Sequence, residues 1–143
     1  MLERLLVLAL VALAAAVFWA ALLLWRRWKL GRLADEAPLA GLVPTGRPAV
    51  VSFSTPQCAE CRSRQGPALA RLSATLGESV TVRGLSALDH PELVDKLGIL
   101  TVPATVVLDA HGRPHHINLG YASERTLVSQ LDSVRSRAPV RPG

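Results

Sequence analysis

The sequence contains little cysteine, which limits how disulfides or thiols can contribute to its structure and chemistry. Only two of its 143 residues are cysteines, so a scaffold held together by several disulfides is excluded. The two cysteines, Cys58 and Cys61, are separated by two residues. This spacing fits a redox-active pair or half of a metal site, and it can also arise by chance. Spacing alone does not distinguish these three explanations.

Aromatic residues and clustered charges are also scarce beyond the N-terminal region. After residue 28 the only aromatic residues are Phe53 and Tyr121. Most of the net charge of +5 comes from one basic cluster: Arg26, Arg27, Lys29 and Arg32. Residues 33–143 carry 11 Lys or Arg against 10 Asp or Glu, a net charge of +1. A nucleic-acid groove needs clustered cations and aromatic stacking partners, so we expect no nucleic-acid partner.

What the sequence does contain is one long apolar run, at residues 5–25. Its 21 residues lie between Arg4 and Arg26, and a helix of this length, at ~1.5 Å per residue, spans the ~30 Å hydrocarbon core of a bilayer. Trp25 and Trp28 lie at its C-terminal end, as is typical of the headgroup layer. A cleaved signal peptide usually has a shorter apolar core, of ~7–15 residues, behind a cationic start. We therefore predict one transmembrane anchor that contacts lipid through residues 5–25.

The charges beside this run also bear on its orientation. The four cations that follow it outnumber Arg4, which precedes it. The positive-inside rule therefore places the rest of the chain in the cytoplasm.

The sequence predicts four parts along the chain. They are an N-terminal anchor with its cationic flank at 1–30, a linker at 31–47, a folded domain at 48–137 and a disordered tail at 138–143. The linker is assigned because its prolines and glycines interrupt any long regular element. The remaining length is sufficient for one hydrophobic core.

Hydrophobic periodicity predicts alternating strands and helices within the domain. The first strand, AVVSFS at residues 49–54, is apolar enough to be buried on both faces. A helix is expected at 59–77, with Leu69, Leu72 and Leu76 on its apolar face and a kink near Gly66 and Pro67. A strand at 79–85, a helix at 90–97 and a hairpin of strands 104–109 and 115–119 follow. The last helix is capped by Ser123 and buries Leu127, Leu131 and Val134. The order β-α-β-α-β-β-α predicts an α/β fold.

Two motifs in this order carry a resemblance to a known family. Residues 48–137 resemble the thioredoxin-like superfamily, because TPQCAEC follows a buried strand and Val102-Pro103 follows some 40 residues later. The resemblance implies a thioredoxin-like fold with a mixed central sheet, preceded by one transmembrane helix. It also implies a monomeric thiol:disulfide oxidoreductase that acts on protein or small-molecule thiols and disulfides, with the Cys58–Cys61 disulfide in place of a cofactor.

The resemblance assigns a role to each site residue. Cys58 would be the nucleophile, because the unpaired amides and dipole of a helix N-terminus favour a thiolate. Cys61, one turn along, would be the resolving thiol that releases the mixed disulfide. Pro103 is expected to be cis and to lie against the disulfide, so that the Val102 backbone pairs with an extended substrate. Tyr121 is a further candidate for substrate contact.

The sequence departs from the family pattern at five positions. Gln57 stands where thioredoxins have tryptophan, and Ala59-Glu60 replaces the usual Gly-Pro between the cysteines. Ser52 aligns with the buried acid that moves protons, and Gly84 aligns near its lysine partner. Because both proton-transfer residues are missing, we expect proton transfer to depend on water.

The residues also allow functions other than a redox pair. His111, His115 and His116 could complete a zinc site, but the ~20 Å length of the intervening strand would hold them away from the cysteines. Arg62 and Arg64 are either a cationic rim for substrate or solvated helix residues. A non-catalytic binding module or a thiol metal-handling protein is the alternative to an enzyme.

Many membrane-tethered relatives act outside the cytoplasm, which opposes the positive-inside rule. The side of the membrane on which the domain lies is therefore not decided by the sequence.

Overall fold

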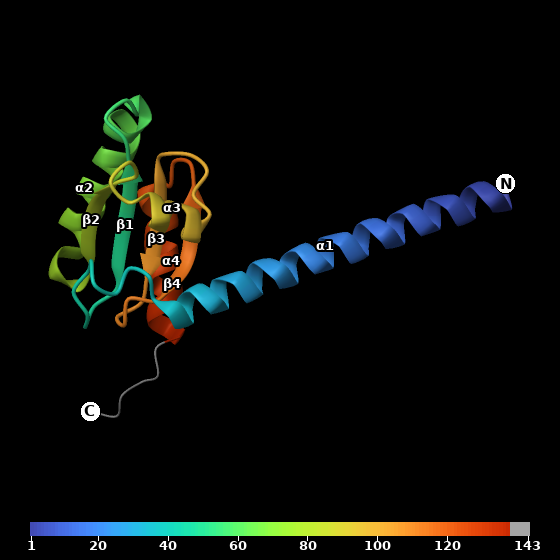
Figure 1. The fold of residues 1–143 in the computed structure, drawn as a ribbon, viewed down its shortest axis with the longest axis horizontal. Helices are drawn as coiled ribbons and strands as arrows, with labels where there is room; N and C mark the ends of the chain where they lie inside the picture. Colours follow the sequence, from blue (N-terminus) through green and yellow to red (C-terminus); the bar gives the residue numbers. More distant parts are fainter. Residues whose placement is uncertain (138–143) are drawn as a thin grey trace. The chain divides into compact units, whose positions relative to one another are not determined.

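The structure is a computed structural model, and it describes residues 1–137 (Figure 1). The chain divides into two compact units, of which the first is Met1–Arg32 and the second begins at Leu33. The predicted disordered tail at 138–143 lies outside the described residues.

The first unit consists of the apolar part of helix α1 (Leu2–Glu36). This helix is long and apolar enough to cross a membrane, and an N-terminal signal sequence would satisfy the same criteria. Its apolar side chains from Leu5 to Trp25 are largely exposed to the surroundings of the protein. An exposed apolar surface of this size is unfavourable in water, which is the physical reason for expecting lipid around it.

The second unit begins earlier than the sequence predicts, because part of the expected linker at 31–47 belongs to its core. Helix α1 continues to Glu36, and Leu33, Leu39 and Val43 are buried against the sheet. Lys96 also forms an ion pair with Glu36, with 2.6 Å between Nζ and Oε2. Pro38 and Gly41 lie in a turn between the buried side chains, so they do not prevent this stretch from packing.

The remaining elements follow the predicted order. They are β1 (Ala49–Ser54), the π-helical segment η1 (Cys61–Gln65), α2 (Gly66–Leu76), the 3-10 turn η2 (Gly77–Ser79), β2 (Thr81–Ser86), α3 (Pro91–Leu97), β3 (Ala104–Leu108), β4 (Pro114–Leu119) and α4 (Glu124–Arg137). As predicted, Ser123 caps the last helix, since its Oγ accepts a hydrogen bond from the Thr126 N–H at 3.2 Å.

The strands form one mixed sheet in the order β2-β1-β3-β4 (Figure 1). Strand β1 is parallel to β2 and antiparallel to β3, and β3 is antiparallel to β4. In this register Phe53 lies opposite Ala104, and Ser52 lies between Gly84 and Thr105. The α/β fold with a mixed central sheet that the sequence predicts is therefore confirmed.

Helices cover both faces of the sheet, so β1 is buried on both sides. Ala49, Val51 and Phe53 point into a core that includes Leu97 of α3. Val50 points to the opposite face, into a core formed with Leu72 of α2 and with Leu127, Leu131 and Val134 of α4. Ser52 alternates with Phe53 and so belongs to the face that α2 and α4 cover.

The helix that carries the cysteines is irregular where the sequence predicts a kink. In η1 the Gly66 N–H donates to the Cys61 carbonyl, five residues earlier, so the turn is wider than an α-helical turn. Pro67 follows and has no N–H to continue the regular pattern. The buried stripe differs from the predicted one: Cys61, Gln65, Ala68 and Leu72 are buried, whereas Leu69 and Leu76 are only partly buried.

Candidate active site

The two cysteines form a disulfide at the junction between β1 and the helical segment. Their Cα atoms are 5.3 Å apart. Cys58 is partly exposed, whereas Cys61 retains 8% of its accessible surface. A partner can therefore reach Cys58 more readily than Cys61.

Backbone groups hold Cys58 in a tight turn after the strand. The Cys58 N–H donates to the Thr55 carbonyl at 3.1 Å. The Cys61 N–H in turn points at the Cys58 Sγ, also at 3.1 Å. A backbone donor at this distance stabilises negative charge on sulfur, so it favours a thiolate when the pair is reduced.

Pro103 lies at the same edge of the sheet as the disulfide. The Val102–Pro103 peptide bond is cis, as the resemblance implies. Ala104 is paired with Phe53, so Pro103 is placed beside the end of β1 from which the chain continues to Cys58. The Val102 side chain is partly buried against the core.

The loop that contains Tyr121 is held to both sides of the site. The Gly120 N–H donates to the Pro103 carbonyl at 2.9 Å, and Gly120 has a φ of 90°, a conformation that favours glycine. The Arg64 guanidinium lies 4.2 Å from the centroid of the Tyr121 ring. Arg64 also pairs with Glu60, at 3.3 Å. Arg64 and Tyr121 are therefore brought together at the surface beside the cysteines.

Gln65 was not singled out by the sequence analysis, although it connects the two halves of the site. Its side-chain amide makes two hydrogen bonds with the backbone of Ala122: Nε2 donates to the carbonyl at 3.1 Å, and Oε1 accepts from the N–H at 3.0 Å. The side chain is 1% exposed. The available signal was its position four residues after Cys61, a polar residue on the face that the helix buries.

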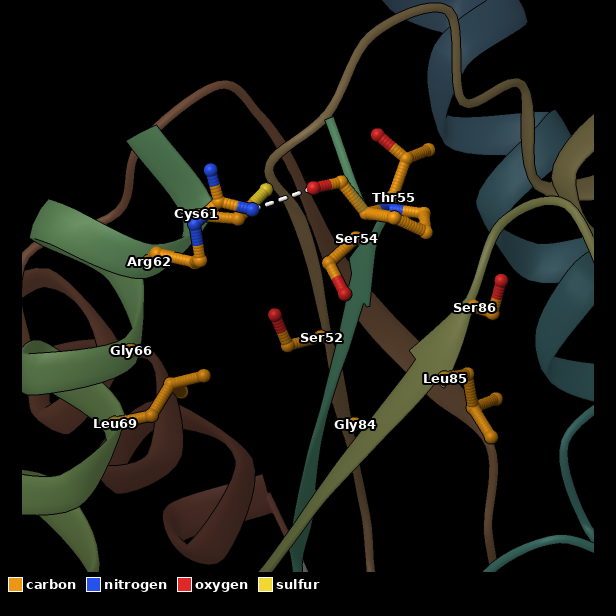
Figure 2. Close-up of a pocket in the computed structure, with 11 residues that line it drawn as sticks. Ser52, Ser54, Thr55, Cys61, Arg62, Gly66, Leu69, Gly84, Leu85 and Ser86 are labelled. Atoms are coloured by element: carbon orange, nitrogen blue, oxygen red, sulfur yellow. Dashed lines mark hydrogen bonds between the residues drawn. The ribbon is translucent and has the colours of Figure 1, made fainter. Parts of the chain in front are cut away.

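A cleft lies between the cysteine-bearing helix and strands β1 and β2. Figure 2 shows the Ser52 hydroxyl pointing from β1 toward this helix, with Cys61 and Leu69 on the opposite wall. Gly84, opposite Ser52 in the sheet, contributes no side chain. Arg62 also lines the cleft, and its guanidinium donates to the Pro56 carbonyl. Two of the departures from the family pattern, Ser52 and Gly84, therefore lie next to each other.

The histidines lie at the other end of strand β3. The His115 Nε2 is 2.9 Å from the Asp109 Oδ2, and the His116 Nε2 is 3.0 Å from the Ser133 Oγ. Burial alone would raise the pKa of the Asp109 carboxyl, but its hydrogen bonds with His115 and with backbone N–H groups outweigh burial and lower it. In the described part of the chain, no group of three or more His, Cys, Asp or Glu side chains is arranged to hold a metal ion. The structure therefore does not bring His111, His115 and His116 together with the cysteines.

Comparison with solved structures identifies the fold. An uncharacterized thioredoxin-like protein from Clostridium perfringens is similar with a TM-score of 0.59 and 19% identity, over 71% of this chain and 87% of that one. Chloroplastic thioredoxin z is similar with a TM-score of 0.57 and 17% identity, over 68% and 85% of the two chains. The fold is thioredoxin-like.

Thioredoxin-2 of a malaria parasite, described as a component of the protein secretion machinery of that parasite, also shares this thioredoxin-like fold. Its TM-score is 0.55 at 15% identity, over 61% of this chain and 82% of that one. No protein-family model matches the sequence, and no curated protein matches it. At these identities the comparisons establish the thioredoxin-like fold, and the chemistry has to be argued from the site itself.

Proposed function

We propose that the protein is a membrane-anchored thiol:disulfide oxidoreductase that exchanges its Cys58–Cys61 disulfide with thiols and disulfides of partner proteins or small molecules. The observation that carries the proposal is the hydrogen bond from the Cys61 N–H to the Cys58 Sγ, on a partly exposed cysteine at the start of a helix. This arrangement favours a Cys58 thiolate, which is the nucleophile of disulfide exchange.

The proposed reaction has two steps when the pair acts as a reductant. The Cys58 thiolate attacks a partner disulfide, forming a bond between the Cys58 Sγ and one partner sulfur while the other partner sulfur leaves as a thiolate. The Cys61 thiolate then attacks the Cys58 Sγ, forms the intramolecular disulfide and releases the first partner sulfur. Two electrons pass to the partner, and the reverse sequence oxidises it.

The surroundings of the pair support a role for three further residues. An extended partner segment would pair with the Val102 backbone, next to the cis bond at Pro103. Tyr121 would contact the partner beside it, in a position maintained by the Arg64 guanidinium.

Helix α1 supports a membrane anchor, because its apolar side chains are exposed.

The direct test is reduction of insulin by dithiothreitol, using the full chain in detergent micelles. We expect the wild-type protein to accelerate precipitation of the insulin chains, and the Cys58→Ser, Cys61→Ser double variant to have no effect. A redox titration of the pair then determines which direction of electron flow is favoured. If the folded wild-type protein gives no acceleration in either direction, the oxidoreductase proposal is wrong and a binding module is the better description.

Membrane attachment is tested separately, by fractionation of cells that express the full chain. We expect the intact chain, at its full 15.3 kDa, to remain with membranes after extraction at high salt and high pH. A shortened product in the soluble fraction would identify residues 5–25 as a cleaved signal sequence instead.

A further inference from the structure

The cleft beside the disulfide is larger than a packing defect. Its volume is about 510 Å³, within the range of roughly 300–1,000 Å³ that is typical of sites for small molecules. Cys61 and Leu69 line its helical side, and Ser52, Gly84 and Ser86 line its sheet side. Cys61, although only 8% exposed, is therefore one of the residues that line the cleft.

Small residues leave this space open. A Cβ atom added at Gly84 would meet no other atom within 4 Å, so the wall of the cleft is set back at this point. The polar groups in the wall are mostly hydroxyls, from Ser52, Ser54, Thr55 and Ser86. No carboxylate or imidazole is among the described residues that line the cleft, so none of its walls supplies an ordinary general base.

Ser52 is the polar group most deeply placed in the cleft. The residue is 6% exposed, and its hydroxyl makes no hydrogen bond with any other residue that the structure describes. Among the described residues, every side-chain nitrogen or oxygen that is fully enclosed has a hydrogen-bond partner. The Ser52 Oγ has no partner among these residues, so it is not fully enclosed and must face the open space of the cleft. A buried hydroxyl in this situation takes its hydrogen bonds from water.

We propose that the cleft is a water-filled path through which the proton of Cys61 reaches solvent, and that the Ser52 hydroxyl positions the water that accepts it. The inference rests on the proposed oxidoreductase function. The step is Cys61–SH losing its proton to water, after which the Cys61 thiolate bonds to the Cys58 Sγ and the partner sulfur leaves as a thiolate. Ser52 acts through water and is therefore a positioning residue.

The test follows the two releases of thionitrobenzoate when the reduced full chain, in detergent micelles, reacts with Ellman's disulfide. The first release reports attack by Cys58, and the second reports the resolving step by Cys61. We expect Ser52→Val and Gly84→Val to slow the second release by about tenfold, because one removes the hydroxyl and the other fills the cleft. Neither change alters the first release.

A carboxylate at the same place provides the complementary test. We expect Ser52→Asp to accelerate the second release by about tenfold at neutral and mildly acidic pH, where a thiol is mostly protonated, and to shift the pH profile of this step to lower pH. A residue with only a structural role would not shift that profile. The matched control is Thr105→Val, which removes another buried hydroxyl from the same face of the sheet outside the cleft.

The outcomes separate this inference from the function on which it rests. A slower second release in both valine variants, with Thr105→Val unchanged, supports the water path. If Ser52→Val fails to fold, Gly84→Val and Ser52→Asp still decide the question. Normal first and second releases in all three cleft variants would overturn the water path and leave the oxidoreductase standing, whereas loss of both releases in the wild type would overturn both.

Discussion

At the scale of single residues, the two cysteines differ in what surrounds them. Cys58 is partly exposed and receives a backbone N–H at its sulfur, whereas Cys61 is buried against the cleft. Exposure and thiolate stabilisation together determine which sulfur attacks a partner first. This asymmetry gives the two thiols distinct roles and makes them separable by mutation.

We therefore expect Cys61→Ser to accumulate mixed disulfides with partner proteins and Cys58→Ser to accumulate few. Without the resolving thiol, the partner stays attached to Cys58. The measurement is non-reducing electrophoresis of each purified variant after exposure to oxidised lysate proteins. Equal trapping by the two variants would contradict the assigned roles.

Gln65 is a second residue whose surroundings lead to a prediction. Replacing Gln65 with leucine removes both hydrogen bonds to Ala122 and leaves a buried N–H and a buried carbonyl without partners. We expect the free energy of unfolding to fall by about 1–3 kcal/mol. Urea denaturation measures the change. The control, Gln57→Leu, alters an exposed glutamine and should change stability by less than about 0.5 kcal/mol; equal effects would show that Gln65 does not anchor the loop.

His116 makes the stability of the domain depend on pH. Burial lowers the pKa of His116, and the positive charges of Arg137 and His115 act in the same direction. The folded state therefore takes up its proton at a lower pH than the unfolded state, whose histidine titrates near 6.5. Below that value the unfolded state binds more protons, so stability is lost as the pH falls through the folded pKa.

We expect the thermal midpoint of the wild type to decrease when the pH is lowered from about 7.5 to about 5.5. The decrease should be smaller in His116→Gln. Scanning calorimetry at several pH values measures the difference. The control His90→Gln removes a histidine at the start of α3, far along the chain from this group. A wild-type pH dependence in His116→Gln would show that another group is responsible.

At the scale of elements, the segment between α1 and β1 shows how a stretch rich in proline and glycine can still be structural. Leu39 is completely buried, and Val43 is nearly so, on the same face of the sheet as Val51 and Phe53. Short turns place these side chains, for example through the Leu42 N–H, which donates to the Leu39 carbonyl at 3.0 Å. The segment therefore completes one of the two cores.

Replacing Leu39 with alanine is expected to lower the free energy of unfolding by about 2–5 kcal/mol, the range for a leucine truncated in a packed core. Chemical denaturation of the full chain in detergent measures this. Leu100→Ala is the control, because Leu100 is 89% exposed and its truncation should change stability by less than about 0.5 kcal/mol. A small effect at Leu39 would mean that the segment is only a tether.

At the level of the whole molecule, the chain divides into an apolar helical unit and a unit with the thioredoxin-like fold. The first unit ends at Arg32, and the buried residues of both cores all come from the second. The second unit also contains every residue of the candidate site. We therefore expect it to fold without the apolar part of α1.

We expect a fragment of residues 31–143 to be soluble and to unfold cooperatively, because it retains Leu33, Leu39 and Val43. A fragment of residues 48–143 lacks these three side chains and should be less stable. Circular dichroism during thermal unfolding compares the two. An insoluble or unfolded 31–143 fragment, beside a folded full chain, would contradict the division into two units.

Features that depend on local pattern could be predicted from the sequence. The length of the apolar run, the buried strand before Cys58, the irregularity near Pro67 and the cap at Ser123 could all be predicted, because periodicity, proline and capping side chains act over a few residues. The position of Pro103 beside the site also followed from sequence, through the resemblance, and the structure places it there.

Which distant residues meet depends on the packing of the folded chain. Gln65 and Ala122 are 57 residues apart, and their contact depends on how η1 and the loop after β4 pack against one sheet. Ser52 and Gly84 become neighbours only because β1 pairs with β2, and the space between them and Cys61 exists because neither side chain fills it. Hydrophobic periodicity, of 2 residues in strands and 3.6 in helices, does not predict such contacts. They depend on the order of strands in the sheet and on the side-chain volumes of residues far apart in the chain.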